Sequence, residues 1–153
     1  MKFIQAKNQA EIFAVIYIRK KVFMDEQNVS VDEELDGRDF AADHYLVESN
    51  NKFIGTCRIY YQDNEATIGR VAVLKEFRKK GIASFMMKKA VKEIDANKIE
   101  TIHIGAQVQA VAFYEKFGFK ISGDLYLDAN IEHYPMVLML WKYPQNMKRK
   151  SLG

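Results

Sequence analysis

The chain has 153 residues, of which 48% are hydrophobic, and a formal net charge of +3. This length predicts one domain, the hydrophobic fraction excludes disorder for most of it, and the small charge argues against a dedicated nucleic-acid-binding protein. No apolar run approaches the roughly 18 residues of a membrane-spanning helix, no signal peptide is visible and Cys57 is the single cysteine, so we expect a cytoplasmic protein.

The first part of the chain predicts a strand and then a helix. Residues 2–7 alternate in polarity, which favours a strand. Asn8 and Glu11 have the spacing of a capping box, so a helix is expected from there to about residue 24. Arg19 lies near its end, where the helix dipole favours cations. An apolar stripe at helical spacing predicts the buried face, and its members are Ile12, Phe13, Ile16, Tyr17 and Phe23.

Residues 25–43 form an acidic segment with one glycine and no long apolar period. The simplest interpretation is a solvated surface loop, with at most a short helix. A connection of this length inside a small domain is often functional, so the segment is also a candidate wall of a substrate site. In that case its carboxylates between Asp32 and Asp39 would attract a cationic substrate.

The rest of the chain begins with a meander of strands and continues with alternating helices and strands. Meander strands are expected at 44–48, 53–61 and 66–73, with a hairpin turn at 49–52. Later elements are a helix at 81–97, a strand at 101–106, a helix at 107–116 ending at Gly118 as a left-handed C-cap, a strand at 119–122, a turn-rich stretch at 123–133 and a last strand at 136–141. This order predicts an α+β or mixed α/β domain over residues 1–145, followed by a polar basic tail at 146–153.

The turn between the third meander strand and its helix is a predicted anion site. Arg78, Lys79 and Lys80 are basic, and Gly81 stands at the first turn of the helix. The N–H groups at a helix N-terminus lack intrahelical partners, and the helix dipole adds partial positive charge. Small residues at Gly81 and Ala83 would let a ligand approach closely. The alternative is an ordinary solvated helix start.

Two motifs resemble the GNAT superfamily of N-acetyltransferases. Arg78-x-x-Gly81-x-Ala83 after a valine-rich strand resembles the acyl-CoA pyrophosphate signature, and residues 112–119 (AFYEKFGF) resemble the second motif, a helix ending in Tyr-x-x-x-Gly-Phe. A narrower resemblance, to the ElaA-like branch, covers most of the chain. It rests on Arg19, Val22-Phe23-x-x-Glu26-Gln27, Glu34-x-Asp36-x-x-Asp39, His44, Ala106-Gln107 and Ile131-x-His133-x-x-Met136.

The resemblance implies a fold and a reaction. The fold is three-layered, with a mixed, mostly antiparallel sheet of about six or seven strands, about four helices and a splayed parallel pair. The reaction transfers the acetyl group of acetyl-CoA to a primary amine of a small molecule or peptide by direct attack, without a metal. A monomer and a homodimer both remain open. The alternatives are a non-catalytic acyl-CoA-binding sensor on the same fold and, last, a nucleic-acid binder using the basic turn and tail.

The coenzyme-binding residues follow from the same resemblance. The backbone of Val71, Ala72 and Val73 would line the pantetheine arm. Gln107 lies where many relatives place a polar residue near the coenzyme, although it could equally cap a helix. The diphosphate would be held by Arg78, Lys79, Lys80, Gly81, Ile82, Ala83 and Ser84.

Catalytic candidates are one acid and three bases. Tyr114 would protonate the departing thiolate, the alternative being a core aromatic residue. Glu26, His44 and His133 are candidate bases, and Glu26 could instead bind the cationic amine. Each candidate base also has a structural alternative: Glu26 could end a helix, His44 could begin a strand and His133 could stabilise a turn.

Two further reactive side chains are interpreted as structural. His103 lies mid-strand in an apolar run, and Cys57 reads as a buried, inert thiol. The three histidines and one cysteine show no metal-binding spacing.

Overall fold

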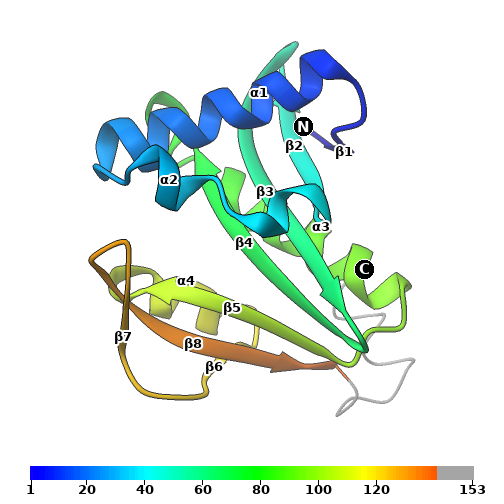
Figure 1. Cartoon of the computed structure of the whole chain (residues 1–153). Coiled ribbons are helices and arrows are strands. Elements are labelled where there is room, and N and C mark those ends of the chain that lie inside the picture. Colours follow the sequence, from blue (N-terminus) through cyan, green and yellow to red (C-terminus); the bar gives the residue numbers. More distant parts are fainter. Residues whose placement is uncertain (141–153) are drawn as a thin grey trace. The chain divides into compact units, whose positions relative to one another are not determined.

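The computed structural model describes residues 1–140, which fall into two units (Figure 1). The first unit comprises residues 1–60 and 69–87, and the second comprises residues 61–68 and the described chain from residue 88 onward. The basic tail predicted at 146–153 and the last residue of the strand predicted at 136–141 lie outside the described residues. Within residues 1–140, no helix is both long enough and apolar enough to span a membrane.

The strands form one eight-stranded sheet in the order β1-β2-β3-β4-β5-β8-β6, with β7 also paired to β8. Their bounds are β1 (Lys2–Gln5), β2 (Asp43–Ser49), β3 (Lys52–Gln62), β4 (Glu65–Val73), β5 (Thr101–Gln107), β6 (Lys120–Ile121), β7 (Tyr126–Asp128) and β8 (Ile131–Met139). β4 and β5 pair in parallel from Glu65↔Thr101 to Ile68↔Ile104. The pairs β1–β2, β2–β3, β5–β8, β6–β8 and β7–β8 are antiparallel. The predicted α+β class and its parallel strand pair are confirmed, but the sheet has eight strands within residues 1–140 rather than the six or seven expected.

Helical segments connect these strands. Within residues 1–140 the four α-helices are α1 (Gln9–Arg19), α2 (Val31–Glu34), α3 (Ile82–Ala96) and α4 (Val111–Glu115). Between them lie a π-helix, η1 (Lys20–Glu26), and three 3₁₀ turns, η2 (Gly37–Phe40), η3 (Lys75–Phe77) and η4 (Val108–Ala110). The helix expected to run to about residue 24 therefore keeps its direction past Arg19 but changes its winding.

In the first unit the predicted start of α1 is correct. The Asn8 side chain accepts a hydrogen bond of 2.8 Å from the Glu11 N–H, and the Glu11 carboxylate accepts one of 3.3 Å from the Asn8 N–H. The hairpin turn between β2 and β3 is also confirmed, with Asn50 and Asn51 both left-handed at φ 52° and 62°.

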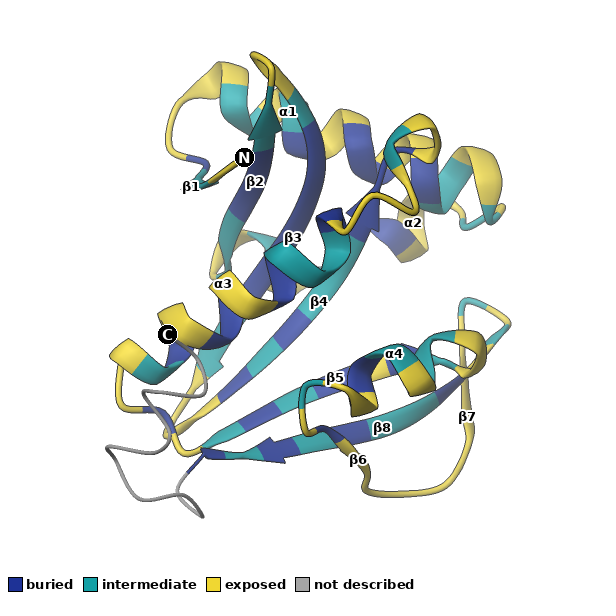
Figure 2. Ribbon diagram, turned by 180° about the vertical axis from the view of Figure 1, so that it is seen from behind, coloured by how far each residue is buried: buried dark blue, intermediate teal, exposed yellow. Residues whose placement is uncertain are grey.

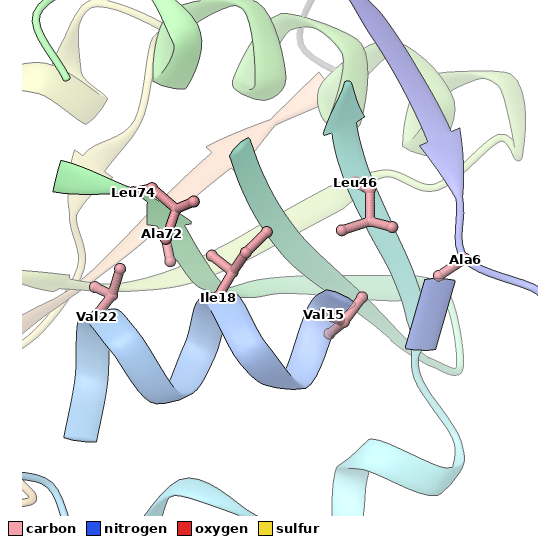
Figure 3. Close-up of a cluster of buried hydrophobic side chains, with 7 residues drawn as sticks. All are labelled: Ala6, Val15, Ile18, Val22, Leu46, Ala72 and Leu74. Carbon is pink, nitrogen blue, oxygen red and sulfur yellow. The ribbon is translucent and has the colours of Figure 1, made fainter. Parts of the chain in front are cut away.

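The predicted buried face of α1 is correct only in part. Ile12 and Phe23 are partly buried and pack against the core cluster, but its fully buried members are Val15, Ile18 and Val22. Phe13, Ile16 and Tyr17 are 60%, 45% and 56% exposed. Apolar side chains occur on more than one side of this helix, so periodicity alone did not define the buried face. The cluster drawn in Figure 3 consists of Ala6, Val15, Ile18, Val22, Leu46, Ala72 and Leu74.

In the second unit β5 pairs with β8 from Thr101↔Met139 to Gln107↔His133. Figure 2 shows buried residues alternating with less buried ones along β5, as expected for a strand with two different faces. Ile94 of α3 is fully buried in this unit, and Met86 and Met87 of the same helix are fully buried in the first unit.

Three predictions for this unit need correction. β8 begins at Ile131 rather than at residue 136, so Pro135 lies inside the strand, opposite Gly105. The stretch expected to be turns contains β7. The helix expected at 107–116 is shorter, because Gln107 ends β5 and η4 precedes α4. Gly118 has φ 95°, which confirms the left-handed cap after that helix.

Candidate active site

The turn before α3 has the backbone geometry of an anion site. Lys79 and Gly81 are left-handed, at φ 63° and 78°. Lys80 between them is not, and such an alternation turns successive N–H groups toward one point. The first helical hydrogen bond runs from Phe85 N–H to Gly81 O over 3.0 Å, so the N–H groups of residues 82–84 belong to the first turn, which lacks intrahelical acceptors. A β-carbon on Gly81 would meet nothing within 4 Å, so the space beside it is open.

Arg78 is fixed at both ends of its guanidinium. Its Nε donates to Val73 O over 2.9 Å, and its Nη2 lies 2.9 Å from Glu26 Oε2. Two residues from separate sequence motifs are thus brought together in the first unit. Glu26 holds Arg78 beside the end of β4, where Ala72 and Val73 are buried.

The acidic segment is not a solvated loop. Glu34 is paired with Arg19 and Arg70, Asp36 with Arg58 and Arg70, and Asp39 with Arg19 and Arg58. Arg19 and Glu34 are 3% and 2% exposed. This six-residue ion-pair network has three positive and three negative charges. The expectation that these three carboxylates attract a cationic substrate is therefore wrong.

The arginines lower the pKa of two carboxylates of the network, Asp36 and Asp39. Burial alone would raise the pKa of Asp39, but hydrogen bonds and charges from Arg19 and Arg58 outweigh it and lower that pKa to about 2. Hydrogen bonds from Arg58 lower the pKa of Asp36 against a smaller opposing effect of burial. Arg58 and Arg70 are missing from the sequence predictions, although arginines inside otherwise apolar strands were a usable signal.

His44 joins the edge of this network. It lies opposite Arg58 in the β2–β3 register, and its Nε2 is 2.9 Å from Asp39 O. A carbonyl oxygen only accepts, so Nε2 carries the proton and Nδ1 carries the lone pair. Nδ1 is buried and has no hydrogen-bond partner among the described residues. A base needs an accessible lone pair, and His44 does not offer one in this structure.

Tyr114 is buried in an aromatic cluster of the second unit. It is 8% exposed and packs edge-on against Phe113 and Phe119, with ring centroids 5.1 Å and 6.2 Å away. Gln107, at the end of β5, makes no side-chain capping bond to η4, contrary to the capping alternative. Its Oε1 accepts from Gln109 Nε2 over 2.6 Å.

His133 is a candidate base whose ring is held by a hydrogen bond through Nδ1. It stands opposite Gln107 in the β5–β8 register and is 9% exposed. Its Nδ1 donates to Ile131 O over 2.7 Å, which assigns the lone pair of a neutral ring to Nε2. The ring stacks on Tyr126, with centroids 5.5 Å apart and planes inclined by 23°.

Tyr126, which stacks on His133, is a neighbour of the candidate base that the sequence did not suggest. Its hydroxyl lies closer to the position of a β-carbon on Gly105 than a real side chain allows, so this approach favours glycine there. Burial, and then the charge of Asp128, raises the pKa of Tyr126. It was hidden because β7 is short and lies in a stretch that resembles a turn.

The remaining reactive groups match structural roles. Burial raises the pKa of Cys57 to about 12, which confirms an inert thiol. His103 is partly exposed and lies 3.1 Å from Glu65 Oε1. Within residues 1–140, no group of three or more His, Cys, Asp or Glu side chains is arranged to hold a metal ion.

A mixed sheet with one parallel pair, and a left-handed basic turn opening α3 between the parallel strands β4 and β5, agree with the acetyltransferase fold that the sequence resembles. A family model described as an acetyltransferase (GNAT) domain matches residues 5–140. The chain belongs to the GNAT acetyltransferase family. The uncharacterised N-acetyltransferase YjcF of Bacillus subtilis is 33% identical over 138 residues, which cover 90% of this chain and 99% of YjcF.

Solved structures share the fold. The crystal structure of Escherichia coli ElaA has a TM-score of 0.80 and 24% identity, covering 89% of this chain and 97% of ElaA. An acyl-CoA N-acyltransferase from Pseudomonas aeruginosa has a TM-score of 0.81 and 22% identity, covering 90% and 99% of the two chains. Together with the sequence match to ElaA, 28% identical over 133 residues, these confirm the resemblance to the ElaA-like branch.

Proposed function

We propose that this protein transfers the acetyl group of acetyl-CoA to a primary amine of a small molecule or peptide. The observation that carries the proposal is the turn at Lys79 and Gly81, whose left-handed residues open α3 in a chain of the GNAT family. An acetyltransferase of Bacillus subtilis that shares this fold, at a TM-score of 0.67 and 15% identity, was crystallised with CoA.

The residues of the first unit fit the coenzyme by their chemistry. The diphosphate takes N–H groups from the turn and the first turn of α3, with positive charge from Lys79, Lys80 and Arg78. The ion pair with Glu26 orients Arg78 toward the diphosphate. The role of Glu26 is therefore to position a coenzyme-binding residue and not to deprotonate or bind the amine. The backbone of residues 71–73 lines the pantetheine arm.

The reaction forms a C–N bond and breaks the C–S bond of the thioester. The amine nitrogen must lose a proton, and the thiolate of CoA must gain one. Tyr114 donates the proton to sulfur. An ordinary phenol holds its proton more tightly than an ordinary thiol, by roughly 1.5 pKa units, so this transfer depends on close positioning.

His133 is the base. Its Nδ1 proton is committed to Ile131 O, so Nε2 is the atom that accepts the proton of the amine, directly or through water. Glu26 is engaged by Arg78, and the lone pair of His44 is buried. His133→Ala is expected to lower amine-dependent thiol release at saturating acetyl-CoA. An unchanged rate would assign the proton transfer to another group.

A non-catalytic acyl-CoA sensor is the second candidate. It is supported by the burial of Tyr114 against Phe113 and Phe119, which gives this tyrosine a role in the core that needs no proton transfer. The sensor needs the coenzyme site and no acceptor amine.

One assay separates the two candidates. Purified full-length protein is mixed with acetyl-CoA and a panel of amines, polyamines, amino sugars and peptides, and released thiol is measured. An acetyltransferase releases thiol only when its amine is present. Calorimetric binding of acetyl-CoA, with no thiol release above background for the whole panel, would favour the sensor. Absence of binding would exclude both.

A further inference from the structure

Arg70 has an unusual backbone conformation for its place in the fold. Its φ is 52°, and it is the only non-glycine residue with positive φ that lies inside a strand within residues 1–140. The others lie in turns and loops. An arginine has no intrinsic preference for the left-handed region, so neighbouring groups must stabilise this geometry.

The guanidinium of Arg70 supplies that stabilisation. Its Nε lies 2.9 Å from Glu34 Oε2, and its Nη2 donates over 2.9 Å to Glu34 O and over 3.2 Å to Asp36 Oδ2. Its side chain is 20% exposed. Four groups of one short segment, counting the Glu33 carbonyl at 3.4 Å, therefore converge on a single side chain.

The partners of Arg70 are themselves fixed. Glu34 is held by buried Arg19 of α1, and Asp36 is held by Arg58 of β3 through two bonds of 2.7 Å. Arg70 is thus tethered to two other elements of the first unit through the ion-pair network. A tether with several bonds restricts the rotation of the arginine and, through it, the backbone to which it is attached.

We propose that Arg70 is a positioning residue for the coenzyme. A left-handed residue inside a strand interrupts the regular alternation of its peptide groups, so residue 70 sets the direction of the N–H and C=O groups that follow. Those groups belong to residues 71–73, to which the proposed function assigns the pantetheine arm, and the inference rests on that assignment. The acidic segment acts on the coenzyme through Arg70 rather than by attracting the amine.

The test is a double-mutant cycle with CoA as the probe and calorimetry as the readout. Arg70→Gly permits the left-handed backbone but removes the tether, and Asp36→Asn weakens the tether from its other end. Each variant is expected to bind CoA about threefold more weakly or worse, and the double variant no more weakly than the worse single one, because the two groups act as one unit. Arg70→Lys keeps the charge with fewer bonds and should lie between Arg70→Gly and the parent.

Arg38→Ala is the matched control. Arg38 belongs to the same segment, is exposed and stacks on the ring of Tyr60 at 4.8 Å instead of joining the network. Its removal should leave CoA affinity unchanged. Thermal melting shows which variants are folded at the assay temperature, and if Arg70→Gly is not, Asp36→Asn and Arg70→Lys decide the matter.

The outcomes distinguish this inference from the proposed function. If the parent binds CoA and the Arg70 and Asp36 variants bind it within about twofold, the positioning role is overturned while the coenzyme site stands. If the parent does not bind CoA, the proposed function fails. Amide hydrogen exchange at residues 71–73 then tests the tether itself: faster exchange in Arg70→Gly than in Arg38→Ala supports it, and equal exchange overturns it.

Discussion

Gly81 shows how one backbone angle shapes the turn that we propose as the coenzyme site. Its φ of 78° costs glycine little but is unfavourable for other residues. The space beside it is open, because a β-carbon there would meet nothing within 4 Å. A larger side chain would therefore act by straining the turn and by occupying the open space, not by disrupting the core.

Gly81→Leu is expected to weaken acetyl-CoA binding about tenfold or more, because the left-handed turn is strained in any other residue. Calorimetry measures the affinity. Gly37→Leu is the control, since Gly37 also has open space around it but is not left-handed. If Gly81→Leu binds acetyl-CoA with nearly the affinity of the parent, the diphosphate does not bind at this turn.

Tyr114→Phe tests the acid without disturbing the packing, because phenylalanine keeps the contacts with Phe113 and Phe119. Turnover is expected to fall about a hundredfold, the lower end of what a positioned acid contributes, with CoA affinity unchanged. Steady-state thiol release and calorimetry measure the two quantities. Tyr17→Phe, at an exposed position, is the control. Equal turnover in both variants would make Tyr114 a core residue only.

At the scale of elements, short-range chemistry was predictable and long-range chemistry was not. The Asn8–Glu11 capping box and the left-handed cap at Gly118 depend on neighbouring residues, and both were found from the sequence. The prediction for the acidic segment failed because the partners of its carboxylates are distant in sequence. Arg70, for example, bonds to this segment across as many as 37 positions. Without those partners, a run of carboxylates looks like a solvated loop.

The ion-pair network also makes stability depend on pH. Asp39 has a pKa of about 2 in the folded protein against 3.8 as its ordinary value. Because the folded pKa is the lower one, its contribution is present above about pH 4 and is lost as the pH falls toward about 2. The loss is about 2 kcal/mol in the free energy of unfolding, as an order of magnitude.

Urea unfolding at about pH 6 and about pH 3 measures roughly half of this loss, because pH 3 is still above the folded pKa of Asp39. In Asp39→Asn the protein should be less stable at both values but should lose less on acidification than the parent. Lys20→Ala is the control, because its pair with Asp25 is largely exposed and contributes little. An equal acid loss in the parent and in Asp39→Asn would show that the effect has another source.

At the scale of the whole chain, the order of elements and two motifs predicted the fold class and the family. These two features did not predict the bounds of the strands. Pro135 indicated the start of a strand, yet β8 passes through it. Gly123 lies close to the ring of Pro135, since a β-carbon on Gly123 would be 3.0 Å from that ring. Tyr126 was missed for a related reason: its position over Gly105 is a tertiary contact with no local pattern. The single domain expected over residues 1–145 stays a prediction.

The equal numbers of arginines and carboxylates in the ion-pair network have a consequence for ionic strength. Because the network is neutral as a whole and largely shielded from solvent, dissolved ions screen it little. The turn around Lys79 and Lys80 is exposed and unbalanced, so its field is the one that salt reduces. Salt is therefore expected to weaken the proposed capture of the anionic coenzyme at this turn while leaving the anchoring of the acidic segment intact, and the two can be studied separately by changing the buffer alone.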